Sequence, residues 1–433
     1  MKHFYSTLNS SLRVPLREAV LKGLADDGGL FMPIHIPVLP LSFIEKLRAL
    51  SFPEISYEIC KILLSECLPD KELKKIVEKA FTFDVPLISV APQIYSLELF
   101  HGPTMSFKDF GARFMAQLMA YYKKEDNKNL NILVATSGDT GSAVGDAFSQ
   151  VEGMHVWILY PKGKVSYSQE KQLTTLGDQV TALEIEGTFD DCQRLVKEAF
   201  CDKELRGKIA LTSANSINIA RLIPQTFYYF YAYSQLKEHS LPIAISVPSG
   251  NFGHLTAGLL AKRMGLPIQT FIAATNINDT VPRYLQEGIF EPRPSQHTLS
   301  NAMDVGNPSN FGRMLDLYEH DREKMLLDIV GYRFTDDETA SAIRDVFENY
   351  DYLMDPHGAV AFLGLKHFFE NSSTPYSGIF FETAHPAKFA NEMEQIIHKN
   401  IIIPNKLQDV LNKKKKSILL STNYSDLKNV LLT

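Results

Sequence analysis

A lysine stands where a helix is expected to begin, in the segment His101–Arg113. After Lys108, apolar residues recur at helical spacing, so the sequence predicts an amphipathic helix from about Asp109. The free backbone N–H groups at a helix start carry a partial positive charge, which disfavours an ammonium group and lowers the pKa of the lysine. A lysine amine that loses its proton can form a Schiff base with an aldehyde. The alternative is a surface lysine whose aliphatic stem covers the helix end.

A glycine-containing loop, Ser249–Gly253, follows a predicted strand and precedes a predicted helix. Gly250 and Gly253 allow the backbone to fold closely around a ligand, and the start of the helix offers free N–H groups, so a phosphate is the expected occupant. The glycine spacing matches neither the dinucleotide motif nor the nucleoside triphosphate motif. An ordinary turn between a strand and a helix is the alternative.

Two further segments place hydroxyl groups at the ends of predicted strands. In the loop after residue 135, Ser137, Thr140 and Ser142 suit a carboxylate or a phosphate, although the same residues also cap ordinary helix starts. Thr383 ends a strand near the C-terminus, where doubly wound sheets place their ligands. Each of these signals is weak when taken alone.

Strands and helices alternate after about residue 95, which predicts an α/β fold with a parallel, doubly wound sheet. Residues 1–95 carry helical patterns broken by proline-rich loops and predict a mostly helical N-terminal domain before a catalytic region over 96–433. The expected strands are Asn131–Ala135, Val156–Tyr160, Val180–Ile185, Ile209–Thr212, Ile243–Val247, Gln269–Ala274 and Gly378–Glu382. The expected helices include Ser142–Phe148, Ser168–Leu176, Phe189–Phe200, Ile219–Gln235 and His254–Met264.

The composition favours a cytoplasmic, soluble protein. A net charge of −6 and a pI near 6.1 give no electrostatic case for nucleic acid or a membrane as partner, and the basic run Lys413–Lys416 is short. The four cysteines form no C-x-x-C pair, no His/Cys/Asp cluster has metal spacing, and no G-x-S-x-G elbow occurs. No signal peptide and no membrane-spanning apolar run is apparent.

Seven segments in order along nearly the whole chain resemble the threonine synthases, pyridoxal-phosphate enzymes of the tryptophan-synthase β-subunit fold type. The resemblance is to the long type, which carries an additional N-terminal domain. The segments are residues 23–33, 101–109, 136–143, 215–225, 248–253, 304–310 and 383–389. The resemblance implies two doubly wound parallel-sheet subdomains around the cofactor, a small one over about 125–240 and a large one formed by the remainder.

The resemblance also implies the roles of the cofactor-binding residues. Lys108 would form the Schiff base with the pyridoxal phosphate aldehyde, and Thr383 would hydrogen-bond the pyridine nitrogen. Because a hydroxyl cannot stabilise a pyridinium as a carboxylate does, the ring is expected to stay largely neutral. The cofactor phosphate would be held by Gly250, Asn251, Phe252, Gly253 and His254. Many relatives have Asn in place of His254, whose backbone N–H would still serve.

Asp139 would face the ring oxygen of the cofactor, where relatives of this fold type often have Asn. The long threonine synthases share this Asp. An ionised carboxylate beside a phenolate is repulsive, so Asp139 must be protonated, turned away, or held by a cation.

The reaction implied by the resemblance is the last step of threonine biosynthesis, in which a carbon–oxygen lyase converts O-phospho-L-homoserine and water to L-threonine and phosphate. Phosphate leaves the γ-carbon, water adds at the β-carbon, and Lys108 moves the protons. We expect the substrate carboxylate near Ser137 and Thr140. For the leaving phosphate we expect Arg221, together with Ser106, Arg113 and Asn215.

Two alternatives stay open at this point. One is another enzyme of the same fold type, such as a serine/threonine dehydratase, and the other is a non-catalytic relative that binds a phosphorylated ligand. The sequence allows a monomer or a homodimer.

Overall fold

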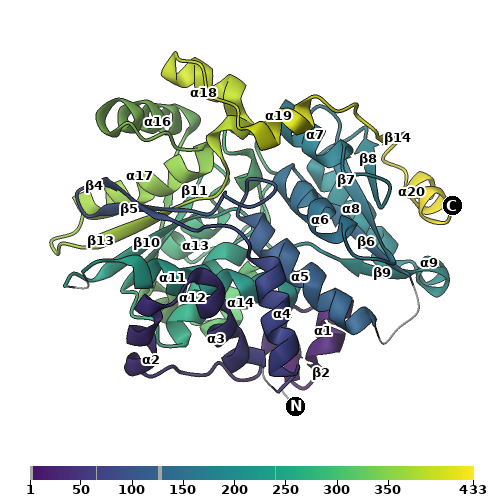
Figure 1. Cartoon of the computed structure of the whole chain (residues 1–433), viewed down its shortest axis with the longest axis horizontal. Helices are drawn as coiled ribbons and strands as arrows, with labels where there is room; N and C mark the ends of the chain where they lie inside the picture. Colours follow the sequence, from purple (N-terminus) through teal and green to yellow (C-terminus); the bar gives the residue numbers. More distant parts are fainter. Residues whose placement is uncertain (1–2, 65, 125–128, 239) are drawn as a thin grey trace.

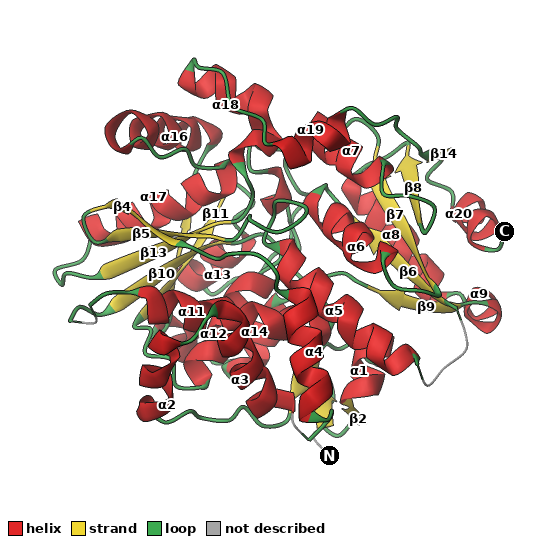
Figure 2. Cartoon of the chain, viewed as in Figure 1, coloured by secondary structure: helices red, strands yellow, loops and turns green. Residues whose placement is uncertain are grey.

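A computed structural model describes residues 3–64, 66–124, 129–238 and 240–433. Over these residues, the strands form a large sheet, a small sheet and a short N-terminal sheet. Figure 1 shows the large sheet on the left, the small sheet on the right and the N-terminal helices below them. The same separation of the strands into groups is visible in Figure 2.

The N-terminal region is mostly helical, as predicted. Its helices are α1 (Leu16–Lys22), α2 (Leu41–Lys46), the 3-10 turn η1 (Leu47–Ala49), α3 (Phe52–Leu64) and α4 (Asp70–Ala80). It also contains an antiparallel sheet of order β2-β1-β3, formed by β1 (His3–Ser6), β2 (Arg13–Pro15) and β3 (Phe31–Pro33). The sequence analysis missed this sheet because strands of three or four residues are too short to show an alternating pattern.

The large sheet has the order β12-β11-β10-β13-β5-β4 among the described residues. Its strands run parallel except β4, which pairs antiparallel with β5 at the edge. Their bounds are β4 (Leu87–Ala91), β5 (Ile94–Glu98), β10 (Ile243–Pro248), β11 (Thr270–Thr275), β12 (Ile329–Arg333) and β13 (Ser377–Glu382). The predicted boundary at residue 95 is therefore too late, because β4 already belongs to the large sheet.

The small sheet is parallel, with the order β14-β8-β7-β6-β9 in the described part of the chain. Its strands are β6 (Leu130–Ala135), β7 (Met154–Pro161), β8 (Val180–Ile185), β9 (Ala210–Ser213) and β14 (Ile418–Leu420). The predicted range of about 125–240 for the small subdomain needs two corrections. The C-terminal segment returns to add β14 at the edge of this sheet, whereas the helices after β9 pack on α3 and the helices of the large sheet.

Helices cover both sheets and connect them. Those from residue 108 to 235 are α5 (Lys108–Lys123), α6 (Asp139–Ser149), α7 (Tyr167–Thr174), α8 (Phe189–Cys201), α9 (Lys203–Lys208), α10 (Ile219–Leu222), the 3-10 turn η2 (Ile223–Thr226) and α11 (Phe227–Gln235). Those beyond are α12 (Gly253–Arg263), α13 (Thr280–Glu287), η3 (Asn301–Met303), α14 (Phe311–Leu317), α15 (Arg322–Leu326), α16 (Asp336–Tyr350), α17 (Pro356–Glu370), η4 (Pro386–Phe389), α18 (Ala390–Ile397), α19 (Asn405–Leu411) and α20 (Tyr424–Leu431).

Helix α5 lies where the parts of the molecule meet. It begins at Lys108, one residue before the predicted start, and contacts α4, α6 and α10. Its apolar residues Phe110, Phe114 and Leu118 are fully buried, as their helical spacing predicts. The position of Lys108 is therefore fixed by a helix that packs on several sides.

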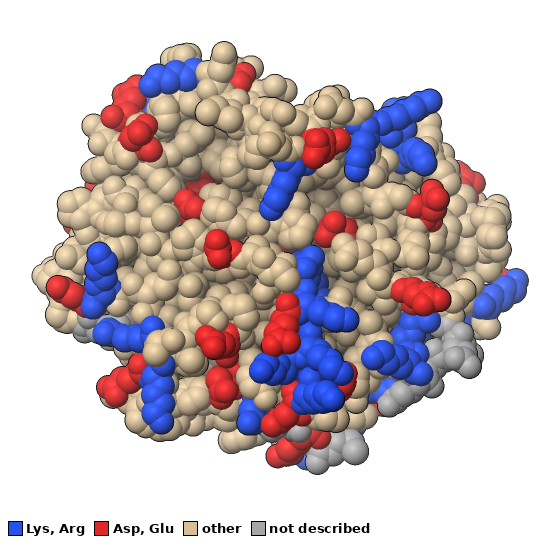
Figure 3. All heavy atoms as spheres, in the orientation of Figure 1, with Lys and Arg blue, Asp and Glu red and all other residues tan. Residues whose placement is uncertain are grey.

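The surface carries charges of both signs. On the face in Figure 3, Lys and Arg are most numerous over the lower part, where α4 lies, and acidic side chains stand among them. The ion pairs on and beside α4 include Lys61–Asp70 and Lys75–Glu72. No helix within the described residues is long and apolar enough to cross a membrane.

A buried arginine ties the N-terminal region to the rest of the fold. Arg313 of α14 is fully buried, and its guanidinium donates to the carbonyl oxygen of Phe31 at 3.1 Å and to that of Ile217 at 2.6 Å. It also donates to Asn310 Oδ1 at 2.6 Å. Three segments far apart in the chain thus share one charged donor.

We expect Arg313→Met to destabilise the fold by about 3 kcal/mol, because it leaves buried carbonyl groups without a donor. Differential scanning calorimetry would show this as a clear fall in Tm. The exposed Arg48 provides the control, and Arg48→Met is expected to leave Tm nearly unchanged. Equal Tm values for the two variants would contradict the proposed role of Arg313.

Candidate active site

Loops from the carboxyl ends of strands in both sheets converge on the start of α5. The Asp139 loop follows β6, the glycine loop follows β10, and Thr383 follows β13. The Phe107 N–H donates to the carbonyl oxygen of Thr383 at 2.9 Å, which brings Lys108 beside the end of β13. This is the edge at which parallel sheets place their ligands.

Lys108 has a largely buried amine. Its side chain is 15% exposed, and Nζ lies 3.8 Å from Asp139 Oδ2. Burial lowers the pKa of Lys108, the cations Lys388 and Arg221 lower it further, and Asp139 opposes them. The sequence analysis predicted a lowered pKa from the helix start, but the main cause in the structure is burial. The unprotonated amine, which is the nucleophilic form, is therefore easier to reach than in an exposed lysine.

The glycine loop leaves donors for an anion at the start of α12. Within the described residues, the backbone N–H groups of residues 251–254 have no hydrogen-bond acceptor. A Cβ atom at Gly250 would lie 2.8 Å from Met303 Cα, so only glycine fits there. Phe252 adopts a left-handed φ of 58° before the helix begins. Such a helix start suits a phosphate.

The side chain of Asn251 braces this loop. It donates to Ser216 Oγ at 2.6 Å and accepts the Ser309 N–H at 2.5 Å. Its amide is therefore used within the protein, and its backbone N–H is the group available to a ligand.

The imidazole of His254 is enclosed by aromatic rings. Its ring centroid lies 4.8 Å from that of Phe107 and 4.9 Å from that of Phe381, with nearly parallel planes. Neither ring nitrogen has a partner among the described residues. Burial and the charge of Lys108 lower the pKa of His254 to about 3, so the ring is neutral. His254 thus offers a backbone N–H to an anion, while its side chain packs in the core.

Asp355 holds Thr383 in place, a role that the sequence analysis missed. Its Oδ2 accepts the backbone N–H groups of Thr383 and Ala384, each at 3.2 Å. Its Oδ1 is hydrogen-bonded to His357 Nδ1. The Asp-Pro-His sequence at the start of α17 signals an N-cap but not this second contact.

Asp139 is held by a cation, the third of the possibilities expected from the sequence. The ammonium of Lys388 lies 2.6 Å from Asp139 Oδ1, and Gln169 Nε2 donates to the same oxygen at 3.1 Å. Although burial opposes ionisation, Lys388 and Lys108 hold the pKa of Asp139 well below its usual range. Lys388 belongs to the segment 383–389, yet its place in the site depends on the turn after β13 and was not predicted.

The residues expected to bind substrate differ in how many of their polar groups already have hydrogen-bond partners within the protein. Ser137 and Thr140 are half-buried, and neither hydroxyl has a hydrogen-bond partner among the described residues. Arg221 is buried, uses one nitrogen on the carbonyl oxygen of Ala214, and keeps Nε unpaired. Burial lowers its pKa to about 10, so it stays charged at neutral pH. Ser106 is fully buried, and Asn215 donates to the carbonyl oxygen of Ala135 at 3.1 Å.

The expectation for Arg113 needs correction. Its guanidinium donates to the carbonyl oxygens of Ala80 at 2.7 Å and Lys79 at 2.9 Å. These are free carbonyl groups at the end of α4, which a cation satisfies well. Arg113 therefore joins α5 to the N-terminal region and is left out of the substrate site.

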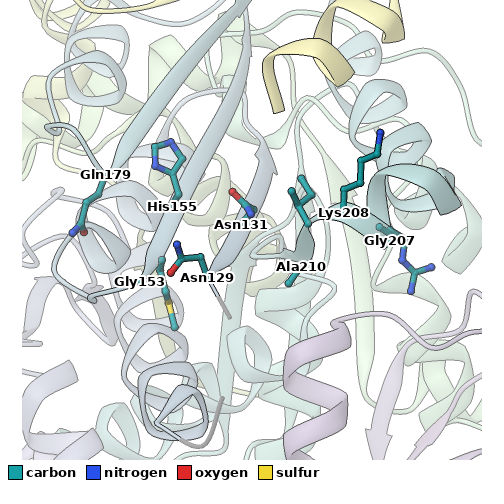
Figure 4. A pocket seen from close by; sticks show the side chains of 11 residues that line it. Asn129, Asn131, Gly153, His155, Gln179, Gly207, Lys208 and Ala210 are labelled. Carbon is teal, nitrogen blue, oxygen red and sulfur yellow. The ribbon is translucent and has the colours of Figure 1, made fainter. Parts of the chain in front are cut away.

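A separate hollow of about 820 Å³ lies at the amino ends of the small-sheet strands (Figure 4). Its lining includes Asn131, His155, Gln179, Lys208 and Ala210. Strands β6 to β9 begin beside it, whereas the loop that carries Asp139 leaves the opposite end of β6. It is therefore remote from Lys108, and we do not assign the chemistry to it.

The donors around Lys108 fit a phosphorylated aldehyde. The amine would hold the aldehyde, the start of α12 the phosphate, and the hydroxyl of Thr383 a ring nitrogen. In the described residues, no group of three His, Cys, Asp or Glu side chains could hold a metal ion. Fold and site together define a pyridoxal-phosphate-dependent enzyme, and the family model of that description matches residues 87–375.

Further comparisons resolve the family. Models described as threonine synthase N terminus and threonine synthase, C-terminal match residues 3–81 and 359–431. The chain is 47% identical to the threonine synthase of Haemophilus influenzae over 406 residues, which cover 94% of this chain and 93% of that one. The chain belongs to the threonine synthase family, and its cofactor is pyridoxal phosphate.

Solved structures agree with this assignment. The crystal structure of threonine synthase from Escherichia coli matches with a TM-score of 0.93 and 42% identity, covering 100% of this chain and 99% of that one. The structure of pyridoxal-phosphate-bound threonine synthase from Brucella melitensis matches with the same TM-score and coverage at 34% identity.

We expect Gly250→Ala to weaken cofactor binding by about 10-fold or more, because the new Cβ would displace the loop from its contact with Met303. Titration of the cofactor-free protein with pyridoxal phosphate, followed by absorbance, gives the apparent Kd.

The control is Gly312→Ala. Gly312 is exposed near the start of α14, and an added Cβ there meets nothing within 4 Å. An unchanged Kd in Gly250→Ala would show that the loop does not hold the phosphate.

Proposed function

We propose that this protein converts O-phospho-L-homoserine and water into L-threonine and phosphate. The relatives named threonine synthases match it over nearly their whole length. The observation that carries the proposal is the buried Lys108 amine near two separate anion-binding features, the start of α12 and the guanidinium of Arg221. Both the cofactor and the substrate carry a phosphate, so the site needs one anion-binding feature for each phosphate.

Lys108 has the properties of the base that this reaction requires. When bound, pyridoxal phosphate supplies an electron sink for negative charge that develops at the substrate α-carbon. Because burial lowers its pKa, the Lys108 amine would take a proton from the α-carbon and, once it has given that proton up, a second proton from the β-carbon. A flexible four-carbon stem that begins at a fixed helix start suits an amine that serves adjacent carbons.

Thr383 would present its hydroxyl to the pyridine nitrogen, oriented by the Asp355 hydrogen bonds to the backbone at 383 and 384. The residues 251–254 would hold the cofactor phosphate through backbone N–H groups. Asp139, kept ionised by Lys388, would stand beside Lys108 at the ring.

For the substrate, we propose that Arg221 binds the leaving phosphate, aided by Ser106 and Asn215. A guanidinium holds a phosphate with two parallel hydrogen bonds and stays charged at neutral pH. The unpaired hydroxyls of Ser137 and Thr140 would receive the substrate carboxylate at the start of α6.

We also propose that the protein acts in the cytoplasm, as a monomer or a homodimer. Cys60, Cys192 and Cys201 form no disulfide, as is usual in a reducing compartment.

We expect Lys108→Ala to abolish the absorbance band of the Schiff base and to lower the rate of phosphate release by about 1,000-fold or more, because the base and the attachment point are lost together. Phosphate and threonine are measured after mixing with O-phospho-L-homoserine. Lys71→Ala, at an exposed lysine of α4, should match the original protein. A Lys108→Ala variant that retains full phosphate release would refute the proposed function.

We expect Arg221→Lys to raise the KM for O-phospho-L-homoserine by about 10-fold or more, because an ammonium cannot replace a bidentate guanidinium. The Kd for pyridoxal phosphate and the Tm should change little, which separates a substrate contact from a structural one. If KM stays the same while the variant is folded, another group binds the leaving phosphate.

A further inference from the structure

Lys388 is a buried cation beside the site, and it has no role in the reaction proposed above. Its side chain is fully buried in η4, within the segment 383–389 that also supplies Thr383. Besides its contact with Asp139, its ammonium donates to the carbonyl oxygen of Thr104 at 2.9 Å. Burying an ammonium is unfavourable unless it is paired and hydrogen-bonded, as it is here.

Asp139 stands between two lysines at unequal distances. Its Oδ1 lies 2.6 Å from the Lys388 ammonium, while its Oδ2 lies 3.8 Å from that of Lys108. Electrostatic attraction falls with distance, so Lys388 is the stronger partner of the carboxylate. Gln169 donates to the same oxygen as Lys388 and helps to keep that side of the carboxylate occupied.

We propose that Lys388 is a positioning residue that balances the charge of Asp139, so that the carboxylate does not hold Lys108 in its protonated form. The inference rests on the proposed function in taking Lys108 as the reacting amine. The same ion pair also joins α6, which follows β6 of the small sheet, to η4, which follows β13 of the large sheet. One contact therefore links the relative position of the sheets to the charge state of the site.

The charged groups around Lys108 support this arrangement. They are Asp139, Lys388, Arg221 and Asp355, and the buried His254 beside them is neutral. Burial lowers the pKa of Lys108, Asp139 and Asp355 raise it, and Lys388 and Arg221 lower it. Loss of Lys388 would remove a repelling cation and free Asp139 to pair with Lys108, and both effects raise the pKa. Loss of the Asp139 charge acts in the opposite direction.

The test measures the pKa of Lys108 in the cofactor-free full chain. Trace labelling with acetic anhydride over a pH series, read for each lysine by peptide mass spectrometry, gives the pH midpoint at which each amine becomes reactive. We expect the Lys108 midpoint to rise by about one pH unit or more in Lys388→Met and to fall in Asp139→Asn.

Two further variants serve as controls. In Lys388→Arg, which keeps the charge, and in the double variant Asp139→Asn/Lys388→Met, which removes both charges, the midpoint should stay close to that of the original protein. The exposed Lys71 in the same digests should not shift in any variant. A purely structural role for Lys388 predicts no such opposite shifts.

Shifts of the two single variants in the same direction, or an unchanged midpoint in Lys388→Met, would overturn the inference. If the unpaired carboxylate prevents Lys388→Met from folding, the double variant decides, since neutral replacements of a buried ion pair are usually tolerated. The pH midpoint of Lys108 in the double variant must then lie above the Lys108 midpoint in Asp139→Asn. The labelling needs no turnover, so absent phosphate release from the original protein would refute the proposed function alone.

Discussion

A lysine amine reacts as a nucleophile or a base only after it has lost its proton, and much of this structure serves that condition at Lys108. Burial at the junction of the sheets makes the charged form unfavourable. The helix that carries the lysine packs against α4, α6 and α10, so the backbone at Lys108 is held in place. A surface lysine at a helix start would feel the same helix field and yet remain protonated.

Burial of that amine brings other charged groups into the interior, and each needs a partner. Asp139 is paired with Lys388, and Asp355 is satisfied by backbone N–H groups and by His357. The neighbouring Glu382 is fully buried, and burial and the nearby Asp355 raise its pKa well above the usual range. These groups set the charge of the site and also fix the turns that carry Thr383 and the loop before α6. Electrostatics and geometry are therefore maintained by the same contacts.

The N-terminal region is joined to the catalytic region by side-chain hydrogen bonds. Arg313 binds the carbonyl oxygen of Phe31, and Arg113 binds the end of α4, so arginines from the catalytic region hold this region in place. Arg113 shows how a residue near a motif is misread from sequence. It lies five residues beyond Lys108 in the same helix, and its side chain points to free carbonyl groups of another helix, which bind a guanidinium well.

The sequence by itself determined the alternation of strands and helices, the helix that begins at Lys108 and the glycine loop, because these follow from local apolar spacing and backbone freedom. It could not determine the return of β14 to the small sheet, the contact between Lys388 and Asp139, or the hold of Asp355 on Thr383. Those contacts join residues separated by up to hundreds of positions, and they form only after the sheets pack. The pKa of Lys108 likewise depends on burial and on charges that tertiary structure brings together, since neither is encoded in its neighbours along the chain.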